Sequence, residues 1–107
     1  MSSEVSEAIA ALQESGLGVG MDYRPRDAAK KLAKLGGDEA VDALIHALHH
    51  HPNQYVRTEV AFALGGMSDP RVLRALGRAA KSDSSRMNVR PIAADAVQKI
   101  QKKQTDQ

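Results

Sequence analysis

Apolar residues recur three and four positions apart along most of the chain, and this spacing places them on one face of an α-helix. In one such segment Val56, Val60, Leu64 and Met67 share a narrow arc of the helical wheel. Glycine, proline or a short polar stretch interrupts the pattern between segments. The pattern predicts helices over residues 3–14, 24–36, 38–50, 55–64, 70–82 and 89–102.

The residues between these segments match the start and stop signals of helices. The glycine pairs at 36–37 and 65–66 end two of them, and Pro70 suits a first helical turn, where no backbone donor is needed. Asp38 is placed to cap the third helix. The stretch GLGVG at 16–20 is predicted to be a flexible loop, because a phosphate-binding G-x-G-x-x-G motif needs a preceding strand and none is predicted.

The helices recur as pairs. A shift of about 32 residues lays Leu32 over Leu64, and a shift of about 33 lays Val56 over Val89. Because one helix pair leaves apolar surface on both flanks, stacking against similar pairs is what buries it. We therefore expect one all-α domain of six helices, stacked as a short right-handed solenoid of three pairs. The domain covers 1–107, and its pairs cover roughly 3–35, 38–67 and 70–102.

The middle of the chain carries a longer motif, V-R-x-x-φ-A-x-A-L-G-x-φ-x-D-P-x-φ-φ-x-A-L over residues 56–76, where φ is apolar. This motif resembles the short HEAT-like repeat of phycobilin-lyase-like proteins and bacterial scaffolds, and the resemblance covers about residues 22–100. It implies an armadillo-like α-solenoid. It also implies that Arg57 and Arg90 tie neighbouring repeats together through carbonyl or Asp partners, although Pro25 stands at the place of Arg57 in the first unit.

An enzymatic interpretation of the same segment lacks its metal ligands. R-T-E-V-A-F-A-L-G-G-M at 57–67 is similar to the repeat of deoxyhypusine hydroxylases, which hold two irons with adjacent His-Glu pairs. Here Thr58 stands at the His position and only Glu59 remains, and no His-Glu step occurs in the chain. The chain also lacks a Cys nucleophile and a G-x-S-x-G elbow, so we expect a non-enzymatic protein with no cofactor.

Three histidines share one helical face. His46, His49 and His50 lie at i, i+3 and i+4, so imidazoles one turn apart can reach the same divalent metal ion. No acidic general base accompanies them as in an H-E-x-x-H helix, and the face lies opposite Leu44 and Leu48. A solvated outer face is the simpler interpretation, and a metal site is the alternative.

Composition limits the cellular setting. The 107 residues include no Cys, carry a net charge of +2 and contain few aromatic residues, with Tyr 2, Phe 1 and Trp 0. No apolar run approaches the roughly 20 residues that span a bilayer, and the amino terminus lacks the basic start of a signal peptide. We therefore expect a cytoplasmic protein with no membrane association.

The second helix of each pair is expected to line the concave face of the stack, so its outward side chains are the predicted partner-binding residues. Tyr55 and Phe62 are the predicted apolar anchors, because Phe62 lies off the apolar stripe of its helix. Packing of Phe62 against a neighbouring helix is the alternative. The flanking residues predicted to bind are Arg26, Lys30, Thr58, Glu59 and Asp95.

The predicted function is a protein-interaction module or adaptor, a scaffold for another protein. A monomer is expected, because the last helix carries Lys99, Lys102 and Lys103 beside its apolar residues. Nucleic-acid binding through phosphates is one alternative, since basic residues cluster at 24–34 and 71–90, although acidic residues interrupt the predicted groove. A chromophore-lyase-like or metal-binding HEAT-repeat protein is the other, and bound tetrapyrrole or iron would distinguish it.

Overall fold

The computed structural model describes residues 3–14, 23–67, 69–85 and 88–105, and among these residues it contains helices and no strand. The predicted all-α class is therefore confirmed. The GLGVG stretch lies outside the described residues. The helices are α1 (Ser3–Leu12), α2 (Tyr23–Leu35), α3 (Asp38–His50), α4 (Gln54–Gly65), α5 (Pro70–Ser82) and α6 (Val89–Thr105).

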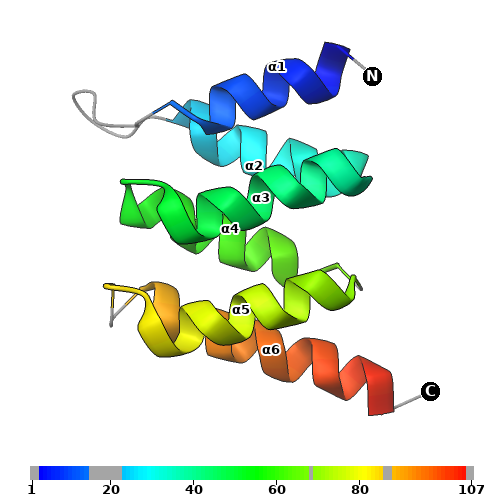
Figure 1. Cartoon of the computed structure of the whole chain (residues 1–107), viewed down its shortest axis with the longest axis vertical. Coiled ribbons are helices and arrows are strands. Elements are labelled where there is room, and N and C mark those ends of the chain that lie inside the picture. Colours follow the sequence, from blue (N-terminus) through cyan, green and yellow to red (C-terminus); the bar gives the residue numbers. More distant parts are fainter. Residues whose placement is uncertain (1–2, 15–22, 68, 86–87, 106–107) are drawn as a thin grey trace.

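The helices form two layers (Figure 1). α1, α3 and α5 stack in one layer and α2, α4 and α6 in the other, and each odd-numbered helix packs on the even-numbered helix that follows it. The stack advances along the longest axis of the molecule, with the N- and C-terminal ends at opposite ends of it (Figure 1). This is the short α-solenoid of three helix pairs that the repeat predicted.

The even-numbered layer is the more tightly packed of the two. α4 makes extensive contacts with both α2 and α6, whereas α3 makes only small contacts with α1 and α5. The tighter packing is thus on the solvent-facing side of α2, α4 and α6, the side that the sequence analysis expects to be concave. We call this surface the even-helix face.

Leucine side chains fill the space between the layers at matched positions. Leu32 of α2 and Leu64 of α4 are 0% exposed, as are Leu44 of α3 and Leu76 of α5. The predicted shift of 32 residues therefore superposes core positions on core positions. Leu35 is 39% exposed, because it lies in the last turn of α2, at the edge of this core.

The helix ends follow the predicted signals with one exception. Asp69 caps α5, its carboxylate accepting from the Arg71 backbone N–H at 2.9 Å. At α3, however, the cap position belongs to Gly37, whose φ of 89° is one that glycine adopts without strain. Asp38 is the first residue of α3, one position past the cap, and its carboxylate accepts from Arg71 at 3.1 Å. Two helix boundaries also differ from the predicted ones: α1 ends at Leu12 and not at residue 14, and α6 continues to Thr105, beyond residue 102.

The stacking can be tested with a matched pair of substitutions. Leu64→Ala is expected to lower the free energy of unfolding by about 2–5 kcal/mol, because it leaves a cavity between layers. Leu35→Ala makes the same chemical change at an exposed site and should cost less than about 1 kcal/mol. Urea denaturation followed by circular dichroism measures both values. Equal losses would contradict the core position of Leu64.

Candidate functional site

α4 occupies the middle of the even-helix face and exposes two aromatic side chains. Tyr55 is 60% exposed and Phe62 is 52% exposed. They lie seven residues apart, nearly two full turns, so both point to the same side of the helix about 10 Å apart along its axis. The helix buries Ala61 and Leu64 and leaves the aromatic strip to solvent. Such a strip offers a partner large apolar area with few rotatable bonds.

Glu59 lies between the two aromatic residues and is tied to α2. Its Oε1 atom lies 3.5 Å from Arg26 Nη2 and 3.9 Å from Lys30 Nζ, and the Glu59 side chain is only 14% exposed. The Thr58 hydroxyl is used within its own helix, donating to the Gln54 carbonyl at 2.9 Å. Three of the predicted binding residues therefore form one ion-pair cluster across the line where α2 meets α4, which we call the α2–α4 seam.

A groove of about 520 Å³ follows the line where α4 meets α6, the α4–α6 seam. Phe62 of α4 and Ile92 of α6 line it, together with Asp95. The Asp95 carboxylate lies 3.3 Å from Lys99 Nζ, one turn further along α6. The structure thus brings the predicted residues Phe62 and Asp95 to one groove, and it adds Ile92, which the sequence analysis did not assign to binding.

Arg57 joins the second helix pair to the third. Its side chain is 11% exposed, and Nη1 donates to the His51 carbonyl at 2.7 Å. Nε and Nη2 donate to the two carboxylate oxygens of Asp83 at 3.1 and 3.4 Å. His51 follows α3 and Asp83 follows α5, so one planar guanidinium connects two successive turns. The structural role that the resemblance implied for Arg57 is confirmed.

The neighbouring turns are tied in a similar way. Arg90 Nε donates to the Asp83 carbonyl at 2.6 Å, which is a bond within the third helix pair and not the contact between repeats that the resemblance implied for Arg90. His51 is 5% exposed, and its Nδ1 accepts from the Asn53 backbone N–H at 3.1 Å. Nε2 therefore carries the proton and donates to the Glu14 carbonyl at 2.7 Å. The sequence analysis assigned His51 no role, although its position 32 residues before Asp83 was a signal that could have found it.

Comparison with protein-family models supports the same architecture. Residues 41–107, more than half of the chain, match a model of HEAT repeats, and residues 25–50 match a PBS lyase HEAT-like repeat. The chain belongs to the HEAT-repeat family. A comparison with curated protein sequences finds no match. In the part of this HEAT-repeat chain that the structure describes, no helix has both the length and the apolar character needed to cross a bilayer.

The histidine face of this HEAT-repeat chain lies on α3, in the layer away from the even-helix face. The ring centroids of His46 and His50 are 4.7 Å apart, and those of His49 and His50 are 6.2 Å apart. Among the described residues no group of three or more His, Cys, Asp or Glu side chains is arranged to hold a metal ion. The metal-site alternative for His46, His49 and His50 therefore lacks a third ligand in this geometry.

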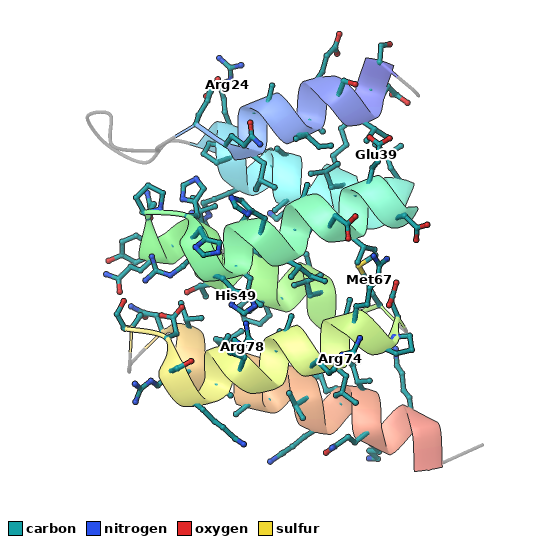
Figure 2. All side chains as sticks on the ribbon, in the orientation of Figure 1. Arg24, Glu39, His49, Met67, Arg74 and Arg78 are labelled. Carbon is teal, nitrogen blue, oxygen red and sulfur yellow. The ribbon has the colours of Figure 1, made fainter. Side chains whose placement is uncertain are left out.

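His49 lies beside Arg78 where α3 meets α5 (Figure 2). Burial is the largest cause that lowers the pKa of His49 from 6.5, and the positive charge of Arg78 acts in the same direction. His50 and His46 also lower this pKa, while the carboxylate of Asp83 opposes the shift. Desolvation and a neighbouring cation both disfavour the protonated ring, so the neutral form is favoured in the folded chain.

Arg71 joins α5 to the start of α3. Its guanidinium lies 2.7 Å from the Asp42 carboxylate, 3.1 Å from Asp38 and 2.9 Å from Asp69. Hydrogen bonds from the Arg71 side chain and backbone are the largest causes that lower the pKa of Asp69. The charge of Arg71 is therefore met by three carboxylates within the protein.

The remaining basic side chains that the structure describes lie on more than one face of the stack. Arg74 and Arg78 lie on α5, which belongs to the layer away from the even-helix face (Figure 2). Arg26 and Lys30 are held by Glu59 on the even-helix face itself. Arg86 lies outside the described residues. The basic residues that nucleic-acid binding would use are therefore divided between two faces of the stack.

The tie made by Arg57 can be tested by removing its charge. Arg57→Met should lower the free energy of unfolding by about 3 kcal/mol, because the Asp83 side chain, which is 6% exposed, loses its partner. Arg74→Met changes net charge equally on an exposed part of α5 and should stay within about 0.5 kcal/mol of the parent chain. Adding Asp83→Asn to Arg57→Met should recover part of the loss. The free energy of unfolding is measured by urea denaturation for Arg57→Met, for Asp83→Asn and for the double variant. If the loss in the double variant equals the sum of the losses in the two single variants, the side chains are not coupled.

The lowered pKa of His49 predicts a stability that falls on acidification. The folded chain binds fewer protons at this site than the unfolded chain. The free energy of folding that His49 contributes through this difference is therefore fully present above the unfolded pKa of about 6.5. It is lost as the pH falls through the pKa of His49 in the folded chain. His49→Gln should flatten the stability curve below about pH 6.5, whereas His46→Gln, at an exposed site on the same helix, should retain most of the slope. Urea midpoints measured across the pH range test this, and an unchanged slope for His49→Gln would count against it.

Proposed function

We propose that this HEAT-repeat chain is a non-enzymatic protein-interaction module, an adaptor that holds a partner protein against the even-helix face. The observation that carries the proposal is the exposure of Tyr55 and Phe62 on one strip of α4. The chain has few aromatic residues, with Tyr 2, Phe 1 and Trp 0, and it places two of them in solvent. Burying these rings against a partner recovers apolar area that folding leaves exposed.

The surroundings of the strip fit a protein partner. Arg26, Lys30 and Glu59 form a charged cluster on one side of it, and Asp95 with Lys99 forms a second on the other. An apolar centre with a polar, partly paired rim is the usual composition of a protein interface. The rim charges orient a partner and set its association rate more than they add affinity.

The family matches support this function at the level of architecture. HEAT repeats stack into curved solenoids, and the curved inner surface of such a stack is where partners bind. The match to the PBS lyase HEAT-like repeat covers residues 25–50, which are parts of the stacked helices α2 and α3. It describes a repeat unit and assigns no reacting group to this chain.

The proposal predicts that partner capture depends on the aromatic strip. Tyr55→Ala combined with Phe62→Ala should reduce capture of partner protein from a native lysate by at least about tenfold, because a few central anchors dominate interface energy. Leu35→Ala truncates another exposed apolar residue, at the end of α2, and should leave capture within about twofold. Circular dichroism confirms that each variant keeps its helices. Undiminished capture by the double variant would remove the strip as the binding surface.

A further inference from the structure

The two seams of the even-helix face can be compared position by position. Leu64 lies 32 residues after Leu32, and Val89 lies 33 residues after Val56. All four side chains are 0% exposed, so they occupy equivalent core positions. These offsets relate α2 to α4 and α4 to α6, and they define which residues should meet at each seam.

The seams differ in chemistry at the equivalent place. By these offsets Lys30 corresponds to Phe62, and Glu59 corresponds to Ile92. Lys30 and Glu59 meet across the α2–α4 seam with Nζ and Oε1 3.9 Å apart, and Arg26 joins them. At the α4–α6 seam the same two places hold Phe62 and Ile92, which line the groove. An ion pair that closes one seam is thus replaced by two apolar side chains at the other.

Two glycines line the second seam. A Cβ atom at Gly65 would lie 3.0 Å from the Cβ of Ala96, so glycine permits the close approach of α4 to α6. Ala33 is the corresponding residue of α2, 32 positions earlier. Gly65 and Gly66 both line the groove and contribute no side chain to it, which leaves space beside Phe62. The groove has a volume of about 520 Å³.

The rim of this groove is positively charged. Among the residues that the structure describes, Lys99, Lys102 and Lys103 line it together with one acidic residue, Asp95. The lysines lie at i, i+3 and i+4 on α6, so they project from one side of the helix. Asp95 is already paired with Lys99 at 3.3 Å. By formal charge, the described lining residues carry three positive groups and one negative group beside an apolar floor.

We propose that the α4–α6 seam is the subsite that selects the partner, and that it takes an acidic protein segment carrying a bulky apolar side chain. The apolar side chain enters the groove between Phe62 and Ile92. Carboxylates that flank it pair with the lysines of α6. This inference rests on the proposed interaction function and adds the chemistry of the partner, because the apolar floor and the charged rim both have to be matched by the same segment.

Two synthetic peptides of equal length provide the probe. Both carry Leu and Phe at helical spacing, and the remaining positions are Glu in one peptide and Lys in the other. Each is titrated into the ¹⁵N-labelled chain and followed by heteronuclear NMR. The Glu peptide should shift the amide signals of Gly65, Gly66 and Ala96, and it should bind at least about tenfold more tightly than the Lys peptide.

Charge reversal supplies the matched control. Lys102→Glu with Lys103→Glu should weaken binding of the Glu peptide by about tenfold or more. Lys34→Glu with Lys81→Glu changes net charge equally and also replaces lysines in the last turns of helices, so it reproduces any effect on the helix ends. This control should weaken binding by less than about threefold.

Several results would overturn the inference. Equal affinity for the two peptides, absence of shifts, or shifts centred on Arg26, Lys30 and Glu59 would each do so. Identical shifts produced by a single-stranded oligonucleotide would identify a general polyanion site instead. If lysate capture needs Tyr55 and Phe62 but is indifferent to Lys102 and Lys103, this inference fails while the proposed function stands. If capture is indifferent to the aromatic strip, the proposed function itself fails.

Discussion

The packing of α4 between α2 and α6 is the interaction on which the rest of the structure depends. A helix pair has apolar surface on two flanks, and in this chain each flank of α4 is covered by a neighbouring even-numbered helix. Ala61 and Leu64 are 0% exposed as a result. The only side of α4 left to solvent is the one opposite α3, and this is where Tyr55 and Phe62 emerge. The stacking constraint therefore determines which strip of sequence can serve as a binding surface.

Hydrogen bonds between turns hold the stack in register. The buried ring of His51 joins the turn after α3 to the chain after α1, and Arg57 joins it to Asp83 after α5. At the other end of the helices Arg71 bridges α5 to Asp38 and Asp42 of α3. Apolar packing alone tolerates small sliding of helices, whereas these directional bonds specify one offset. A face held at both ends loses little conformational entropy when a partner binds, which favours affinity.

Helix content and the repeat offset could be predicted because both depend on local spacing of apolar residues, as Leu32 and Leu64 illustrate. Other features depend on contacts between helices. Glu59 occupies an outward position on its helical wheel, but ion pairs to α2 leave its side chain only 14% exposed. His51 follows the half-buried His49 and the exposed His50, and its own burial is explained by its bond to the neighbouring turn. The cap of α3 differs from its prediction by one residue, because Asp38 was expected at the cap position and Gly37 occupies it.

The two seams differ in the free energy that a partner would gain or lose by covering them. A partner that lands on the α2–α4 seam must disturb or desolvate the ion pairs of Glu59, and the cost of desolvation offsets much of the new attraction. At the α4–α6 seam, burial of the Phe62 surface that is 52% exposed covers about 100 Å² of ring. That burial contributes about 2.5 kcal/mol, and neither Phe62 nor Ile92 carries a charge that a partner has to desolvate. In a stack whose units share one backbone architecture, replacing one pair of facing side chains is enough to put an apolar groove where the preceding seam has an ion pair.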